Sequence, residues 1–202
     1  MIDIARQLTT VYREVGPDPS GEALGVLLRR RYPAPAAEVF AALTDPDRLG
    51  RWYRAVAGDL RAGGDFTLAG GPGGRILQCE PPQRLRLTWG AEPATVDIRL
   101  GTDESGEVVL ELEHVLGAEP AATALSVGPG WDVRLLALDR FLRGEHTDDP
   151  TGWKGSEDVQ RFAQHAISAW AAAVSASGIA AEDDLTGART AALARYAPDV
   201  TT

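Results

Sequence analysis

The sequence predicts an α+β fold in which a curved antiparallel sheet wraps around one long helix. Apolar and polar residues alternate on successive short segments, most clearly at 84–89 and 95–100. This pattern is typical of strands that are covered on one face only. Apolar residues at 131–142 then recur with helical spacing, so a long helix follows the strands. This order favours a sheet that packs against that helix.

The elements before the main run of strands begin with residues 1–21. We interpret them as an N-terminal lead-in, because they end in the turn-rich sequence GPDPSG. A strand is expected at 24–32, which two nearby prolines end. A first short helix is expected at 36–43. Asp45 followed by Pro46 is typical of a helix start, so a second short helix comes next.

Further strands alternate with turns that are rich in glycine and proline. We interpret the glycine-rich segment 70–74 as a flexible hairpin loop near the rim of the sheet. No Lys-Ser or Lys-Thr pair follows it, as a phosphate-binding loop would require. The expected strands lie near 55–60, 65–69, 75–80, 84–89, 95–100 and 107–116.

The long helix is expected to begin at Gly128-Pro129-Gly130 and to end at Gly144. Its main apolar residues are spaced at i, i+4, i+7 and i+11, so they share one side of the helix. We expect this side to cover the sheet. The stripe consists of Trp131, Leu135, Leu138 and Leu142.

We interpret residues 145–202 as a C-terminal extension to the domain at 22–144. Its polar first residues are interpreted as a connection, and two helices are expected after it. The first lies between Ser156 and Gly178, and the second spans about 182–196. We favour packing of their apolar stripes on the outside of the domain. A homodimer interface is the alternative.

Composition and charge exclude several classes of function. Of the 202 residues, 20 are Lys or Arg and 29 are Asp or Glu, which gives a formal net charge of −9. This balance argues against nucleic acid and against an anionic membrane surface as partners. Cys79 is the single cysteine, so no internal disulfide is expected. With no signal-peptide pattern and no apolar run near ~20 residues, we expect a cytoplasmic protein.

Several motifs follow one another in an order that resembles a known superfamily. They are Tyr32-Pro33-Ala34-Pro35, Ala42-Leu43-Thr44-Asp45-Pro46, Arg51-Trp52-Tyr53, Gly63-Gly64-Asp65-Phe66, Glu80-Pro81-Pro82, Leu87-Thr88-Trp89, Leu110-Glu111-Leu112-Glu113-His114 and Gly130-Trp131. Over residues 22–144 the chain resembles the START and polyketide-cyclase-like superfamily (SRPBCC). Within it, the chain is most similar to bacterial proteins that resemble the activator of the heat-shock protein 90 ATPase.

The resemblance implies a helix-grip fold, in which the sheet and the long helix enclose an elongated apolar cavity. It implies no catalytic residues, because the superfamily has no shared catalytic set. A small hydrophobic or aromatic ligand is therefore the expected partner. The alternative is that the same side chains interdigitate as a dry core. The periodicity of the sequence does not distinguish a filled interior from a hollow one. The expected cavity residues are Trp52, Tyr53, Phe66, Leu68, Leu87, Trp89, Val96, Ile98, Leu110, Leu112, His114, Trp131, Leu135 and Leu138.

Three polar residues are candidates for the interior. His114 shares the parity of Leu112 and is expected to point inward, either toward a ligand or as a core histidine bonded to a backbone carbonyl or a tyrosine. We favour the core histidine. Arg30 has inward parity as well, but we favour a solvent-exposed position, because a buried arginine needs a partner. If Arg30 is buried, Glu80 or Gln78 is the expected partner.

The sequence leaves three functions open. The favoured one is a small-molecule binding protein. The second is a cyclase-like or hydrolase-like enzyme that would use His114, with Arg30 or Glu80, in the same cavity. The third is a co-chaperone-like interaction module. No catalytic residue is assigned. The histidine spacing predicts no metal site, and no cofactor is expected.

Overall fold

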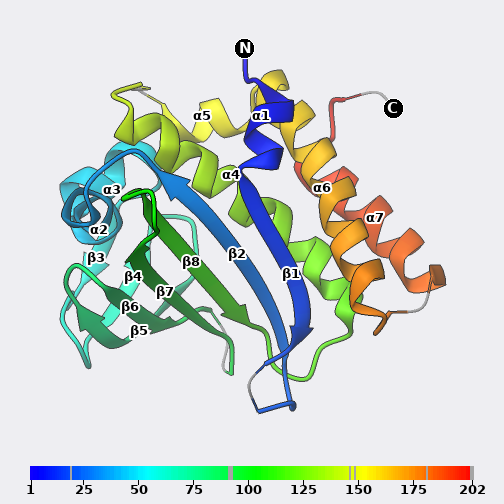
Figure 1. The fold of residues 1–202 in the computed structure, drawn as a ribbon, viewed down its shortest axis with the longest axis horizontal. Helices are drawn as coiled ribbons and strands as arrows, with labels where there is room; N and C mark the ends of the chain where they lie inside the picture. Colours follow the sequence, from blue (N-terminus) through cyan, green and yellow to red (C-terminus); the bar gives the residue numbers. More distant parts are fainter. Residues whose placement is uncertain (19, 91–92, 146, 148, 181, 201–202) are drawn as a thin grey trace.

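An eight-stranded antiparallel sheet forms the centre of the computed structural model, which describes residues 1–18, 20–90, 93–145, 147, 149–180 and 182–200 (Figure 1). The strand order is β1-β2-β8-β7-β6-β5-β4-β3, so the first two strands lie at one edge. The strands are β1 (Val11–Pro17), β2 (Leu24–Tyr32), β3 (Val56–Gly58), β4 (Asp65–Leu68), β5 (Gly73–Glu80), β6 (Arg84–Thr88), β7 (Thr95–Thr102) and β8 (Val108–Val115).

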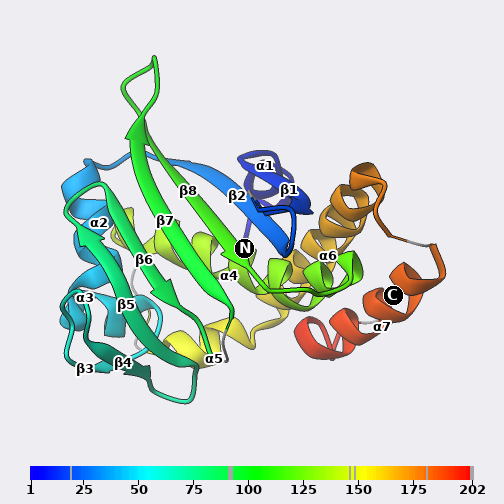
Figure 2. The same ribbon diagram turned by 90° about the horizontal axis from the view of Figure 1, so that it is seen from below.

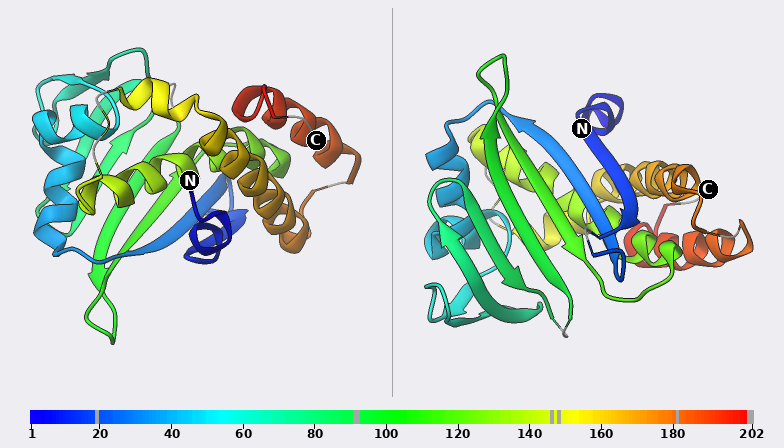
Figure 3. Two further views of the ribbon diagram at one scale, coloured as in Figure 1. Left: turned by 90° about the horizontal axis from the view of Figure 1, so that it is seen from above. Right: turned by 60° about the horizontal axis from the view of Figure 1, so that its bottom comes forward.

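The helices lie on the concave face of the sheet and at its β1 edge (Figures 1 and 2). The long helix α4 crosses the sheet, and α2 and α3 lie at one of its ends (Figure 3). The bounds are α1 (Ile4–Thr9), α2 (Ala36–Thr44), α3 (Pro46–Trp52), the 3-10 turn η1 (Ala121–Thr123), α4 (Ala124–Leu142), α5 (Pro150–Lys154), α6 (Glu157–Ser177) and α7 (Glu182–Tyr196).

The predicted α+β class is confirmed, and so is the order of its main elements. Alternation fixes which side of each strand faces α4. On β8, for example, Val108, Leu110, Leu112 and His114 are buried in turn. Asp45 caps α3 as expected, because its side chain accepts hydrogen bonds from the next two amide groups of the helix after Pro46.

The N-terminal residues differ from the expected lead-in. They contain α1 and the strand β1, which pairs with β2 along its whole length from Val11 opposite Arg30 to Pro17 opposite Leu24. Val11 and Val15 are buried beneath the helices. The first seventeen residues therefore complete one edge of the sheet.

The long helix begins earlier than the sequence analysis expected. It starts at Ala124, so Gly128-Pro129-Gly130 lies inside it, where the proline removes one helical hydrogen bond. Close packing explains the first glycine. A Cβ atom on Gly128 would lie 2.4 Å from the Trp170 ring on α6, so only glycine lets the two helices approach.

The C-terminal helices pack on the domain. Helix α6 contacts α4 and β1, and α7 contacts α6 and α4. The apolar stripe of α6 is buried within the chain, and Gly178 ends the helix in the left-handed conformation at φ 69°. The sequence pattern does not predict α5, which begins inside the expected connection at 145–152 and ends beyond it. In the part of the chain that the structure describes, no helix has the length and apolar character of a membrane span.

Candidate ligand-binding site

A cavity of about 120 Å³ lies between α4, the sheet and α3. Its wall is almost entirely apolar, and Arg134 is the one charged side chain among its lining residues. The lining residues are Leu43, Thr44, Leu49, Trp52, Tyr53, Val56, Leu60, Phe66, Leu68, Ile76, Cys79, Leu85, Leu87, Trp89, Val96, Ile98, Leu110, Leu112, Trp131, Arg134, Leu135 and Leu138. The apolar residues selected from the sequence all occur in this wall.

Helix α4 supplies one wall of the cavity through a single stripe of side chains. Trp131, Leu135 and Leu138 are spaced at i, i+4 and i+7 and face the sheet together. The opposite wall comes from side chains of β4 to β8, and on β4, β6 and β8 these alternate with exposed or half-buried residues. Backbone geometry thus brings side chains from distant parts of the chain around one apolar space.

Aromatic rings form one end of the cavity wall. The ring centroids of Phe66 and Trp89 lie 6.3 Å apart, and those of Trp89 and Trp131 lie 5.2 Å apart. At α3, the Trp52 indole N–H donates to the carbonyl of Ala42 at 2.9 Å. These contacts orient flat apolar surfaces toward the cavity, and such surfaces suit an aromatic ligand.

His114 lies in the core and does not line the cavity. It is 3% exposed, and its Nδ1 accepts a hydrogen bond of 3.0 Å from the Trp131 indole N–H. Burial, together with the nearby charge of Arg134, lowers the pKa of His114 to about 4. The expected core histidine is therefore found, with a tryptophan as partner in place of a carbonyl or tyrosine, and the neutral ring holds Trp131 in the cavity wall.

The expected exposure of Arg30 is wrong. Its side chain is buried beneath α4, where it lies 3.2 Å from the carboxylate of Asp139 and donates to Gln7 at 2.5 Å. Glu80 is exposed at the other side of the sheet and accepts a hydrogen bond from Gln78. Arg30 therefore obtains its partners from α4 and α1, and neither Arg30 nor Glu80 lines the cavity.

A group of three cationic side chains surrounds Tyr53 at the edge of the cavity. Arg134 donates to the Tyr53 hydroxyl at 3.1 Å, and the Lys154 Nζ lies 4.2 Å from the centre of the Tyr53 ring. The Arg54 guanidinium lies 6.0 Å from the same ring. Burial, and then the charges of Arg134 and Arg54, lowers the pKa of Lys154 to about 7.

The sequence pattern predicts neither Arg134 nor Lys154 as a site residue. Arg134 is three residues after Trp131 and four before Leu138, so it is a charged residue within the apolar stripe. Lys154 is the one lysine of the chain and ends α5. Asp149 followed by Pro150 starts that short helix with the same pattern that correctly predicted α3.

The described residues contain no group of three or more His, Cys, Asp or Glu side chains placed to hold a metal ion. Chemically, the site offers apolar contact area, a tyrosine hydroxyl and positive charge. It offers no nucleophile with an adjacent base among the residues that line it.

A curved antiparallel sheet that packs against one long helix is the architecture of the START-like, or SRPBCC, class of proteins. The chain belongs within it to the family described as Activator of Hsp90 ATPase homolog 1-like protein, and the match spans residues 33–143. Among curated proteins, none matches the sequence significantly.

The chain is similar to CalU16 from Micromonospora echinospora. The CalU16 crystal structure is 38% identical, with a TM-score of 0.66, over 81% of this chain and 98% of CalU16. The NMR structure of CalU16 is 37% identical, with a TM-score of 0.69, over 83% of this chain and 96% of that chain. Both matches extend beyond the residues that define the family.

The solution structure of an Aha1 dimer from Colwellia psychrerythraea shares the fold. It is 18% identical, with a TM-score of 0.53, over 60% of this chain and 97% of that chain. At this identity the likeness concerns the fold alone. Dimer formation is a property of that protein.

Proposed function

We propose that this protein binds a small apolar molecule, about the size of one aromatic ring, in the cavity beneath α4. The observation that carries the proposal is the cavity itself, which has room of about 120 Å³ inside an apolar and aromatic wall. An engineered apolar cavity of about 150 Å³ binds benzene. Drug-sized ligands occupy roughly 300–1,000 Å³, so a larger ligand would require α3 or α4 to move.

A binding role agrees better with the side chains than an enzymatic one. His114, the sequence-based candidate for acid–base chemistry, does not line the cavity and is bonded to Trp131. With a pKa near 4 it stays neutral at physiological pH. Arg30 is bound to Asp139. None of the residues named for the enzymatic alternative, His114, Arg30 and Glu80, lines the cavity, so we retain binding in the cytoplasm as the proposed function.

The proposal is tested with toluene and indole as probes, followed by methyl NMR. We expect saturable chemical-shift changes at methyl groups in the cavity wall, such as those of Leu87 and Leu112. We expect no change at Leu136, which packs in a separate apolar cluster with Phe162 of α6. The variant Leu87→Phe fills part of the cavity and is expected to weaken binding at least tenfold.

A variant of matched size outside the cavity controls for general loosening. Leu28→Phe adds the same ring volume on β2, where Leu28 is buried and does not line the cavity. Folded Leu28→Phe protein is expected to bind the probes with nearly the affinity of the wild-type protein. Absence of saturable binding by either probe to the wild-type protein would contradict the proposed function.

A further inference from the structure

Positive charge gathers at one edge of the cavity in a protein that is otherwise acidic. Arg54, Arg134 and Lys154 all approach Tyr53, although the chain has a formal net charge of −9. None of the three forms an ion pair with a carboxylate of the described residues. We call these three side chains the cationic cluster.

Arg134 connects the cationic cluster to the cavity. It lines the cavity, and its guanidinium carbon lies 4.6 Å from the centre of the Trp131 ring and 5.5 Å from that of Tyr53. Its Nε donates to the Tyr53 hydroxyl. Aromatic contacts and one neutral hydrogen bond therefore hold the group, and the terminal N–H groups that suit a bidentate anion form no carboxylate bond here.

Lys154 reaches the cationic cluster from the C-terminal extension. It is the last residue of α5, which lies beside α4, where Trp153 stacks with Arg140 at 4.8 Å. Its half-buried ammonium group is placed over Tyr53, near two guanidinium groups. Like charges in a poorly solvated place repel each other, and a bound anion would remove that repulsion.

Arg54 is fixed by backbone atoms of the glycine-rich hairpin. Its NH1 donates to the carbonyl of Ala69 at 2.6 Å and to that of Gly70. A Cβ atom on Gly70 would lie 3.0 Å from that nitrogen, so glycine leaves room for the guanidinium. The hairpin therefore holds a third positive charge at the same edge.

We propose that the ligand is an organic carboxylate whose apolar body occupies the cavity and whose carboxylate binds Arg134 and Lys154 in the cationic cluster. This inference rests on the proposed function and adds the class of the ligand. Arg134 supplies a fork of donors and Lys154 a mobile point charge, so the pair suits a planar carboxylate at the end of an apolar group. Arg54 contributes charge at longer range.

Three probes of nearly equal shape separate charge from apolar contact. They are 3-phenylpropionate, its neutral amide and 3-phenylpropylamine, and their affinities are measured by calorimetric titration at pH 6.5. We expect the carboxylate to bind at least tenfold more tightly than the amide, and the amine to bind most weakly. The variants Lys154→Met and Arg134→Met are each expected to reduce the tenfold preference to below threefold.

Two further variants test the role of charge. Lys154→Arg keeps the positive charge and is expected to retain most of the preference. Arg86→Met removes one charge from an exposed position on β6 and is expected to leave the preference unchanged. Circular dichroism confirms that each variant is folded, and the amide serves as a measure of an intact cavity.

Because Lys154 is the single lysine, its ammonium group can be titrated alone by NMR in protein labelled with ¹³C at lysine Cε. Without ligand we expect a midpoint near pH 7, as its lowered pKa of about 7 indicates. Saturation with 3-phenylpropionate is expected to raise that midpoint by at least one pH unit. Saturation with the amide is expected to leave it in place.

The outcomes distinguish the two proposals. Equal affinity for the carboxylate and the amide, with an unchanged Lys154 midpoint, overturns the inference and leaves the cavity as a site for neutral ligands. Failure of all three probes to bind contradicts the proposed function itself. Binding of the carboxylate that survives Lys154→Met and Arg134→Met shows that its charge is recognised elsewhere, which also overturns the inference.

Discussion

Helix α4 divides the interior of this protein into two regions that are stabilised in different ways. Toward β1 and β2, the helix presents Asp132 and Asp139, and each carboxylate bonds to a buried arginine of the sheet. Toward β4 to β7 it presents the apolar stripe of the cavity wall. Ion pairs require fixed geometry and close packing around them, whereas apolar contacts carry no such directional demand.

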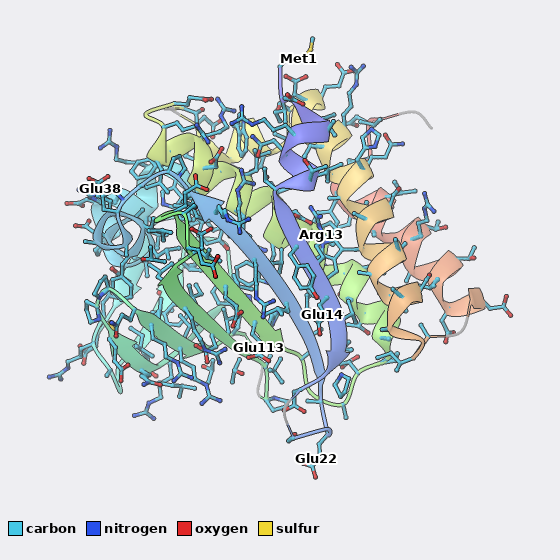
Figure 4. All side chains as sticks on the ribbon, in the orientation of Figure 1. Met1, Arg13, Glu14, Glu22, Glu38 and Glu113 are labelled. Atoms are coloured by element: carbon cyan, nitrogen blue, oxygen red, sulfur yellow. The ribbon has the colours of Figure 1, made fainter. Side chains whose placement is uncertain are left out.

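We call the region toward β1 and β2, with its two buried ion pairs, the paired region, and the region of the cavity wall the apolar region. A buried network around Asp132 stabilises the paired region. Arg13 donates to its two carboxylate oxygens at 2.9 Å and 2.8 Å, and the Trp170 indole N–H donates to one of them at 2.7 Å. Arg13 lies on β1 at the edge of the sheet (Figure 4). This one residue of α4 thus joins β1 and α6 to the long helix.

The largest effect is expected from removing one partner of that network. Asp132→Ala leaves the Arg13 guanidinium buried without its carboxylate, and this is expected to lower the free energy of unfolding by about 3–5 kcal/mol. Urea unfolding followed by tryptophan fluorescence measures the change. Arg161→Ala breaks an exposed ion pair on α6 and serves as a control, with an expected loss below about 1 kcal/mol.

The double variant Arg13→Met with Asp132→Leu separates charge from packing. Because it removes both charges and keeps apolar volume, it is expected to recover most of the stability that Asp132→Ala loses. A loss as large as that of the single variant would mean that the ion pair itself stabilises the fold. In that case the two regions of the interior would differ in energy as well as in geometry.

Local patterns in the sequence predict the apolar region well and the paired region poorly. Alternation on β6 to β8 identifies the cavity wall, because each apolar residue signals burial by itself. The strand β1 offers only Val11 and Val15 as aliphatic residues, with Arg13 between them. The burial of Arg13 depends on Asp132, which lies 119 residues further along the chain. No local sequence pattern contains that partner.

The same reasoning explains the misjudged position of Arg30. Arg30 does have the inward parity that the sequence predicts, but its expected partners lay on other strands of the sheet. The actual partner, Asp139, comes from the helix above the sheet. Asp132 and Asp139 are seven residues apart, so the two carboxylates share one side of α4. In this chain, that pair of acids within the apolar helix is the sequence feature that accompanies the two buried arginines of the sheet.

His114 lies where the two regions meet, between Val26 of β2 and Val96 of β7. Its protonation makes the stability of this part of the interior depend on pH. Its pKa in the folded protein is about 4, while an unfolded histidine has a pKa of about 6.5. Between these values the unfolded state binds more protons, so stability falls as the pH is lowered from about 6.5 to about 4. We expect this group to contribute a loss of about 2–3 kcal/mol over that range.

The contribution is measured as a difference between two stability curves. His114→Asn is expected to flatten the dependence of unfolding free energy on pH between 4 and 6.5, and His165→Gln on the exposed face of α6 controls for loss of a histidine. If the curves of wild type and His114→Asn stay parallel over this range, the histidine does not become protonated on unfolding as we infer.

Close packing between α4 and α6 predicts the next effect. Gly128→Ala places a Cβ atom 2.4 Å from the Trp170 ring, so the indole or a helix must shift, at a cost of about 1–3 kcal/mol in unfolding free energy. Gly187→Ala in the exposed part of α7 meets no atom within 4 Å and is expected to stabilise by about 0.5–1 kcal/mol. Thermal unfolding of both variants checks this contrast of sign.

The smallest effect is expected inside the cavity, and it compares the two regions directly. Leu87→Phe adds volume where about 120 Å³ is free, so the unfolding free energy is expected to change by less than about 1 kcal/mol. Leu28→Phe adds the same volume where the interior is filled, and a loss of about 1–3 kcal/mol is expected. Equal losses for the two variants in urea unfolding would show that the cavity closes in solution, because a filled interior resists added volume wherever it is placed.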